Sequence, residues 1–325
     1  MNRGGREIVT SSTGSADSAG PSSEGDATRV RLSVVIPVYN EQDTIGECLG
    51  LLIKQIEHIA EVVVVDNNST DRSRKIVEDA MSGCPVITMI DETRQGLVYA
   101  RNAGLDAATG DVIARIDADT RVPERWAQTI VEFFEHDAEK EWAALCGRGA
   151  AYGLPFEGWT SKWKARLRPV FDALPSRSTA AAPEDIAVRE SPVLYGSNMV
   201  VRRETWAAIR DTVSMRRDVF EDVDMGLCVR DINGRNAFLT SITVGVSPRR
   251  METGMLAFME YMSFLPRTLL LHRRYGMAAT VVLGYLPPLF AVHGARLVMI
   301  RAYDPQTASF SVRNFWRPTA QRCLP

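Results

Sequence analysis

The chain has 325 residues, of which 45% are hydrophobic, and a formal net charge of -2 at pH 7. This length and apolar content suffice for one large α/β core with an appendage, while the near-neutral charge and the absence of a basic, aromatic-rich module argue against a nucleic-acid partner. The five cysteines are odd in number, widely spaced and free of CxxC pairs, as expected for reduced thiols of a cytoplasmic protein.

Residues 1–29 are rich in Gly, Ser and Ala and contain no apolar stretch. We expect a disordered leader here rather than a secretory signal, so no export is implied. A domain over residues 30–250 should follow, with a first half at 30–122 and a second half at 123–250. A C-terminal helical segment is expected over residues 251–325.

Apolar, β-branched runs alternate with helical patterns along the first half. Residues 32–38 read as a buried strand, and from Asp43 the apolar positions recur at helical spacing, with Asp43 or Thr44 as the cap. The same unit repeats, with strands expected at 62–65, 86–90 and 111–116 and helices after Asp66, at 96–108 and at 123–136. This alternation predicts an α/β fold with a doubly wound, mostly parallel sheet, whose ligand site lies beyond the carboxyl ends of the strands.

Two acidic residues, Asp117 and Asp119, directly follow the expected strand at 111–116. Alternation along an extended segment places both carboxylates on one side. Such acids are by themselves common turn and capping residues. At the end of a strand in this sheet, however, they favour a hard divalent cation, Mg²⁺ or Mn²⁺, that bridges to a diphosphate.

Several motifs, taken in order, carry a family resemblance. The segments SVVIPVYNEQDTI, VVVVDNNSTDRS and GLVYARNAGLDAATGDVIARIDADTRVPERW resemble the nucleotide-sugar-binding half of the family 2 glycosyltransferases of GT-A fold. The resemblance continues through VLYGSNMVVRRETW to FEDVDMGLCVRDINGR and so covers roughly residues 32–240. It implies a metal-dependent, inverting glycosyltransferase that moves a sugar from a nucleotide-diphosphate sugar to an acceptor hydroxyl. No QxxRW element of the polymerising members follows Asp222, which implies a single, non-processive transfer.

The resemblance also implies roles for residues of the donor half. Asp66 would bond the edge of the base, Arg101 would lie near the nucleotide, and Asp119 would coordinate the metal between the two phosphates, with Asp117 at the ribose or metal. By the same resemblance, the nucleoside is wrapped by Pro37, Val38, Tyr39, Asn40 and Glu41. The turn after the second strand is shaped by Asn67, Ser69 and Asp71, and Ala118 completes the acidic turn. Two alternatives stay open, namely a plain helix cap for DNNSTD and a buried structural role for Arg101.

On the acceptor side, the resemblance implies that Asp222 is the general base, that Glu221 orients or polarises, and that Asp224 replaces Asp222 if the register shifts. The alternative is that these acids only complement the dipole of a helix that ends at Gly234. A small-residue loop, Gly196, Ser197 and Asn198, would face the sugar and acceptor, or form an ordinary tight turn.

Other features of the second half leave alternatives open. The family's late metal-binding histidine is absent from VGVSPRRMETG, where Arg249 and Arg250 either neutralise the leaving diphosphate or are surface charges. Residues 152–192 read as a loop-rich insertion whose Trp159 and Trp163 stack on a sugar or anchor the loop.

The chain becomes strongly apolar from Gly254. Four side chains share one helical face, with a basic cluster behind them: Met255, Phe258, Met259 and Met262, then Arg267, His272, Arg273 and Arg274. This pattern indicates a helix at a membrane interface, or else one that covers the core. Because residues 277–292 number only 16 and include Gly284, Pro287 and Pro288, we expect them not to span a bilayer, which needs about 20 residues. At the inner face of a cell membrane, the acceptor would be a lipid-linked or cell-envelope glycan.

Two other functions compete with an active glycosyltransferase. One is a catalytically silent GT-A module that binds a nucleotide sugar or a partner, although the joint presence of Asp117, Asp119 and Asp222 favours the enzyme. The other is a nucleotidyltransferase, which would carry a glycine-rich loop with a basic residue after the first strand, where this chain has PVYNEQD.

Overall fold

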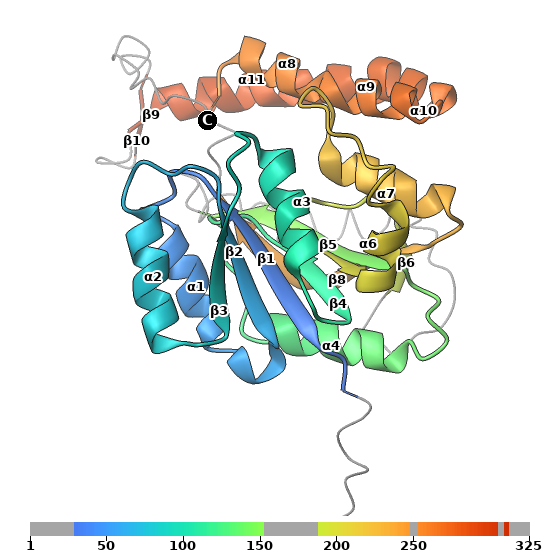
Figure 1. Cartoon of the computed structure of the whole chain (residues 1–325). Coiled ribbons are helices and arrows are strands. Elements are labelled where there is room, and N and C mark those ends of the chain that lie inside the picture. Colours follow the sequence, from blue (N-terminus) through green and yellow to red (C-terminus); the bar gives the residue numbers. More distant parts are fainter. Residues whose placement is uncertain (1–28, 153–187, 248–252, 305–308, 312–325) are drawn as a thin grey trace, which may run out of the picture.

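The computed structural model of the chain describes residues 29–152, 188–247, 253–304 and 309–311. It comprises an eight-stranded sheet with helices on both faces and a layer of helices across one end (Figure 1). The expected leader, Trp159 and Trp163, and Arg249 and Arg250 lie outside the described residues.

The sheet has the order β3-β2-β1-β4-β7-β5-β8-β6. Its strands are β1 (Leu32–Val38), β2 (Glu61–Asp66), β3 (Ile87–Asp91), β4 (Val112–Arg115), β5 (Ala144–Ala151), β6 (Val188–Glu190), β7 (Met199–Arg202) and β8 (Asn236–Val246). Strands β7 and β6 run antiparallel to their neighbours, and the remaining pairs are parallel. The mostly parallel sheet expected from the sequence is therefore confirmed.

Helices cover the two faces in separate groups (Figure 1). They are α1 (Ile45–Ile53), α2 (Ser73–Gly83), α3 (Leu97–Ala107), α4 (Trp126–His136), α6 (Arg203–Ile209) and α7 (Glu221–Asp231), with a short 3-10 turn, η1, at Ile56–His58. Alternate side chains of β1 point to opposite cores, with Val34 packed beneath α1, α2 and α4 and Val35 beneath α3, α6 and α7. Every residue of β1 is buried, which explains its continuous apolar sequence.

A glycine sets how closely α3 approaches the sheet. A Cβ on Gly104 would clash with Val35 and lie 2.9 Å from Cγ2 of Val65. The helix therefore lies directly on β1 and β2. One turn earlier on this helix, Arg101 is carried toward the carboxyl edge of the sheet.

The end of α7 differs from expectation. The helix ends at Asp231, and Asn233 adopts the left-handed conformation with φ 62°. We expected Gly234 to end the helix. A Cβ at Gly234 would lie 2.7 Å from Val229 and 2.9 Å from Ala143, so close packing rather than backbone conformation explains this glycine.

The C-terminal segment forms a helical hairpin, which we define as α8 (Met255–Met262), α9 (Phe264–Leu271), α10 (Tyr275–Thr280), a π-helical turn η3 (Val281–Tyr285) and α11 (Leu286–Ala302). The hairpin lies across the end of the sheet where the loops after β1 and β2 emerge (Figure 1). A short two-stranded sheet, β9 (Tyr303–Asp304) with β10 (Ser309–Phe310), follows.

The helix is longer than the 16 residues, 277–292, on which the expectation rested. Tyr275–Ala302 is one continuous helix of 28 residues, long and apolar enough by length and composition to cross a membrane. Proline in a regular helix lacks a donor and clashes with the carbonyl four residues earlier. The π turn at Val281–Tyr285 is separated by one residue from Pro287 and Pro288. Its wider hydrogen-bonding pattern accommodates both prolines without ending the helix.

Candidate functional site

The loops that follow β1 and β2 are fastened to one another. Asn40 takes a left-handed conformation (φ 53°), and its Oδ1 accepts the backbone N–H groups of Thr70 at 2.8 Å and Asp71 at 3.3 Å. In return, Ser69 Oγ accepts the N–H of Asn40 at 3.2 Å. Ser73 Oγ accepts the N–H of Glu41 at 2.7 Å. The DNNSTD segment is therefore a hydrogen-bonded loop at the edge of the sheet and not only a helix cap.

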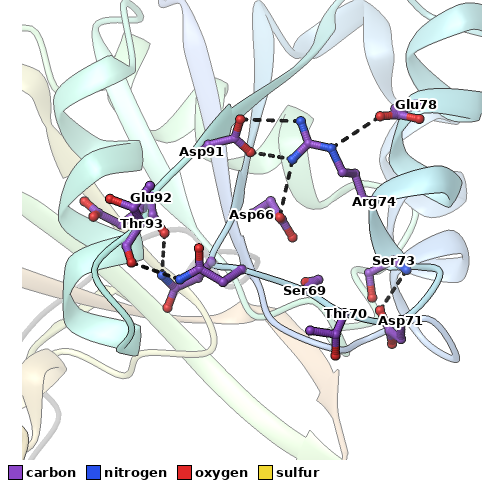
Figure 2. Close-up of polar contacts among 12 residues, drawn as sticks. Asp66, Ser69, Thr70, Asp71, Ser73, Arg74, Glu78, Asp91, Glu92 and Thr93 are labelled. Atoms are coloured by element: carbon purple, nitrogen blue, oxygen red, sulfur yellow. Dashed lines mark hydrogen bonds and ion pairs between the residues drawn. The ribbon is translucent and has the colours of Figure 1, made fainter.

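Asp66 ends β2 beneath these loops and is only 5% exposed. Its Oδ2 lies 3.5 Å from Arg74 of α2, which also pairs with Asp91 at the end of β3 and with Glu78 one turn along its own helix (Figure 2). The hydrogen bond from Arg74 lowers the pKa of Asp91. Oδ1 of Asp66 is buried and has no hydrogen-bond partner among the described residues. A buried carboxylate oxygen without a donor is costly, so a ligand N–H would be stabilised there.

Asn67, expected to shape the turn after β2, bonds to the neighbouring loop instead. Its Nδ2 donates to the carbonyls of Glu92 at 2.7 Å and Arg94 at 2.8 Å, and its Oδ1 accepts the N–H of Gly96 at 2.8 Å. The side chain is 3% exposed. Its hydrogen-bonding groups are therefore used to hold the loop between β3 and α3.

Two buried arginines join the donor half to the acceptor half. Arg101, 2% exposed, donates from Nη2 to Asp117 Oδ1 at 2.7 Å and forms an ion pair through Nη1 with Glu221. Arg115, 1% exposed, lies 3.7 Å from the same Glu221 carboxylate. Arg101 is therefore a buried, paired arginine, as the structural alternative proposed, and it also contacts the acidic turn; its position near a nucleotide stays a prediction.

Several N–H groups of these two arginines have no acceptor among the described residues. Nε of Arg101 and both Nε and Nη2 of Arg115 lack hydrogen-bond partners among the described residues. Burial and the neighbouring Arg101 lower the pKa of Arg115 to about 9, against the opposing effects of Asp222 and Asp117. Buried cations of this kind favour an anionic ligand nearby.

Asp117 and Asp119 form a tight turn after β4. Thr120 Oγ1 accepts the N–H of Asp117 at 3.1 Å, and Tyr152 donates its hydroxyl to the carbonyl of Asp119 at 3.0 Å. Ala118 is buried in the core, whereas both acids are partly exposed, as strand alternation predicts. Burial raises the pKa of the neighbouring Cys48 thiol, and the two carboxylates raise it further. This local excess of negative charge on hard oxygen atoms suits a divalent cation.

The loop before β7 fixes the orientation of Asp222. The N–H of Gly196 donates to Asp222 Oδ2 at 2.7 Å, and Oδ1 accepts the N–H of Val223 at 2.9 Å. A Cβ on Gly196 would lie 3.0 Å from Arg115 Nη2 and 3.2 Å from Asp222 Oδ2. The glycine is therefore required by close approach, as expected for a site loop.

Two predicted site residues lie elsewhere. Asn198 is fully buried, where its Oδ1 accepts Trp126 Nε1–H at 3.0 Å and its Nδ2 donates to the carbonyl of Ile242. Asp224 is 1% exposed, and its carboxylate is bonded to the N–H of Ser214 at 2.7 Å and to His272 at 2.9 Å. The expectations for both residues are therefore corrected. Asn198 stabilises the core and does not face the site, and the buried Asp224 is unsuited to replace Asp222.

Sequence reasoning missed Arg115, Arg74 and His272. Arg115 had a detectable signal, because a charged residue inside an otherwise apolar strand requires a partner. Arg74 has the sequence context of an ordinary exposed helix residue. The importance of His272 depends on a contact with a helix more than 40 residues earlier.

Comparison with known proteins gives a consistent family assignment. The sequence model described as Glycosyl transferase family 2 matches residues 33–221. An uncharacterized glycosyltransferase of Escherichia coli (strain K12), YibD, is 31% identical over 139 residues, 42% of this chain and 40% of that protein. An undecaprenyl-phosphate 4-deoxy-4-formamido-L-arabinose transferase of Pseudomonas fluorescens (strain Pf0-1) is 38% identical over 97 residues, 28% of each chain.

A solved structure extends the likeness to the fold. The crystal structure of S. aureus TarS 1–349 in complex with UDP-GlcNAc has a TM-score of 0.52 and 17% identity, covering 80% of this chain and 73% of that one. The aligned segment spans 40% or less of the two curated relatives. The family match itself covers more than half of the 325 residues. The chain therefore belongs to glycosyl transferase family 2.

Proposed function

We propose that the protein is a metal-dependent, inverting glycosyltransferase that transfers one sugar from a nucleotide-diphosphate sugar to an acceptor hydroxyl. One observation carries the proposal: Arg101 contacts Asp117 of the acidic turn and Glu221, the residue adjacent to Asp222. A single buried guanidinium thus holds a cation-binding carboxylate and a base-bearing helix at the same edge of the sheet.

The donor half supplies the groups that a nucleoside diphosphate needs. Asp66 Oδ1 accepts an N–H of the base, and the interlocked loops at Asn40 and Ser69 enclose the nucleoside. TarS, the neighbour in fold, binds UDP-GlcNAc, which supports a uridine nucleotide as the first donor to test. Arg101 and Arg115, both buried and with N–H groups that lack acceptors among the described residues, offset the charge of the diphosphate.

The acceptor half supplies the proton acceptor. Asp119 and Asp117, at the edge of the donor half, would hold Mg²⁺ or Mn²⁺, and the cation would offset the charge of the departing diphosphate. Asp222 removes the acceptor hydroxyl proton as that oxygen attacks the anomeric carbon from the opposite side, which inverts the centre. The hydrogen bond from Gly196 directs the Asp222 carboxylate, and the ion pair with Arg101 fixes Glu221 beside it.

The test is turnover by the full chain with Mn²⁺, with UDP-glucose, UDP-GlcNAc and GDP-mannose as donors and with a bacterial polyprenyl-linked glycan extract as the source of acceptor. Turnover is measured as nucleoside diphosphate release above the rate with water alone. We expect Asp222→Asn to bind donor like the wild type and to lose about 100-fold in turnover, as on removal of a general base. Asp211→Asn, a fully solvated acid with a side chain 96% exposed, is the control and should retain activity. Donor binding without any turnover by the wild type would instead identify a catalytically silent module.

We further propose that the acceptor is lipid-linked and that the hairpin lies on the cytoplasmic face of a membrane. Within residues 276–300 the only charged residue is Arg296, yet apolar side chains along this stretch are exposed, including Leu283 at 78% and Val292 at 57%. Water is a poor solvent for such a surface, whereas a bilayer interface suits it. The P. fluorescens relative, named for an undecaprenyl-phosphate acceptor, supports this proposal.

The helix can lie in the interface without crossing the bilayer. Phe258 of α8 stacks on His293 of α11, with ring centroids 3.8 Å apart, and Leu286 is buried against the same side of the hairpin. These contacts keep α11 alongside α8, so that its other side faces the lipid. The hairpin then holds the carboxyl edge of the sheet near the headgroups, within reach of a hydroxyl group on a lipid-linked sugar.

A further inference from the structure

The first turn of α7, which carries Glu221 and Asp222, is held directly by the hairpin. The N–H of Phe220, the residue before Glu221, donates to Thr268 Oγ1 of α9 at 2.9 Å, and Thr268 is fully buried. The Phe220 ring packs edge-on against Tyr261 of α8, with centroids 4.7 Å apart. The start of the helix that bears the proposed base is therefore part of the hairpin interface.

A second attachment lies one turn further along α7. His272 Nε2 is 2.9 Å from Asp224 Oδ1, and His272 Nδ1 is 3.0 Å from Asp231 Oδ2. Arg274 donates to the other oxygen of Asp231 at 2.7 Å. The side chains of His272 and Asp224 are 9% and 2% exposed. Because carboxylates only accept, both contacts of His272 are hydrogen bonds when both ring nitrogens carry a proton.

We infer that His272 is a positioning residue: by clamping α7 to the hairpin, it sets the position of Asp222 and couples docking of the hairpin to catalysis. The inference rests on the proposed function, because it assumes that Asp222 is the base. Asp224 lies in the first turn of α7 and Asp231 is its last residue, so one imidazole holds the helix at two points about two turns apart. A displacement of about 1 Å at a reacting group costs on the order of 100-fold in rate.

A metal ion is the competing explanation for this cluster. The possible ligand atoms of Asp224, Cys228 and His272 lie within 4.8 Å of one another. A metal would need His272 Nε2 and a Cys228 thiolate. Both ring nitrogens of His272 already face a carboxylate, so neither is left over for a metal. The clamp accounts for His272 and Asp224 without an ion.

The test is a double-mutant cycle on the full chain, scored as nucleoside diphosphate release from the UDP-glucose, UDP-GlcNAc and GDP-mannose panel. We expect His272→Gln to lower kcat about 10- to 100-fold with the donor KM unchanged. In the Asp222→Asn background, His272→Gln should cause no further loss, because a residue that acts only through the base has nothing left to position. His136→Gln, which alters an exposed histidine on α4, is the matched control with unchanged kcat.

Amide hydrogen exchange supplies a measurement that does not depend on turnover. In His272→Gln and in Thr268→Val, exchange at residues 220–224 should rise at least tenfold while exchange in α3 stays unchanged. If Asp222→Asn is impaired and the losses from His272→Gln and Asp222→Asn are additive, the clamp is rejected and the proposed base stands. Unchanged exchange at residues 220–224 would reject the clamp in the same way. Full activity of Asp222→Asn would reject the proposed base itself. One equivalent of zinc in the purified protein, lost in Cys228→Ser, would replace the clamp with a metal site.

Discussion

Asp119 gives the clearest test at the scale of single residues, because its carboxylate is partly exposed on the turn after β4. Metal and nucleotide should bind in one linked event, since the diphosphate completes the coordination that Asp117 and Asp119 begin. At 100 times the dissociation constant such a ligand stabilises a protein by about 2.7 kcal/mol. We expect Asp119→Ala to abolish the thermal shift produced by UDP with Mn²⁺.

The matched control is Asp79→Ala, which removes a solvated acid on α2 that pairs with Lys75. This variant should keep the full shift with UDP and Mn²⁺. A wild-type shift in Asp119→Ala would show that the metal is bound elsewhere.

Gly196 gives a second residue-scale prediction. An added methyl group would approach Arg115 Nη2 to 3.0 Å and Asp222 Oδ2 to 3.2 Å, so one of these groups must move. We expect Gly196→Ala to lower turnover by about 10- to 100-fold, as for a small misplacement of a reacting group. The comparison is Gly50→Ala in α1, where a Cβ meets nothing within 4 Å. This alanine should stabilise the helix by about 0.5–1 kcal/mol relative to glycine. Equal turnover by both variants would contradict the role given to Gly196.

The sequence located the candidate site residues unevenly, for a physical reason. Asp117, Asp119 and Gly196 were predicted because strand alternation and a small-residue loop are local patterns. Asn198 was misplaced, because nothing local shows that its amide bonds Trp126 and Ile242 across the sheet. The bridge from Arg101 to Glu221 joins residues 120 positions apart, and no pattern within one segment predicts it.

At the scale of elements, Glu61 shows how the start of β2 is tied to its neighbours. Its Oε1 accepts Ser33 Oγ–H at 2.6 Å and the N–H and hydroxyl of Thr109 at 2.5 and 2.9 Å. Burial raises the pKa of Glu61, but these hydrogen bonds outweigh it and the net pKa is lowered. A lowered folded-state pKa means that the stabilisation is present above the unfolded value of about 4.5 and is lost as the pH falls through the folded value.

Glu61→Gln should therefore cost about 1.5–3 kcal/mol in the free energy of unfolding at pH 7, the range for hydrogen bonds to a charged group. The difference from the wild type should shrink when urea unfolding is repeated near pH 3. A pH-independent difference would show that packing, not ionisation, is the source.

The elements were predictable where their pattern is local. Strands β1 to β4 and the helices between them lie within a few residues of expectation, because β-branched runs and helical spacing mark them directly. The order β4-β7-β5-β8-β6 was not predicted, since each of these pairings joins distant segments. The 28-residue helix was missed because Pro287 and Pro288 were taken as breaks, whereas a π turn accommodates them.

At the scale of the whole molecule, the hairpin predicts binding to anionic membranes. The exposed apolar side chains need covering, and the exposed Arg273 and Arg301 flank the long helix at its two ends. The full chain should co-sediment with vesicles containing phosphatidylglycerol at low salt. Binding should weaken as salt rises, because the screening length is only about 10 Å at 0.1 M.

The decisive variants test the apolar side of the hairpin separately from its charge. Leu283 and Val298 are 78% and 54% exposed, and replacing both with Glu should abolish vesicle binding while leaving UDP binding intact. Ile53→Glu places the same charge on an apolar α1 residue that is 38% exposed and should bind vesicles like the wild type. Alkaline carbonate should release a helix that lies in the interface, whereas a spanning helix would remain with the membrane. If the full chain fails to bind at low salt, or the double variant binds normally, the hairpin is not a lipid surface and the proposal of a lipid-linked acceptor loses its structural basis.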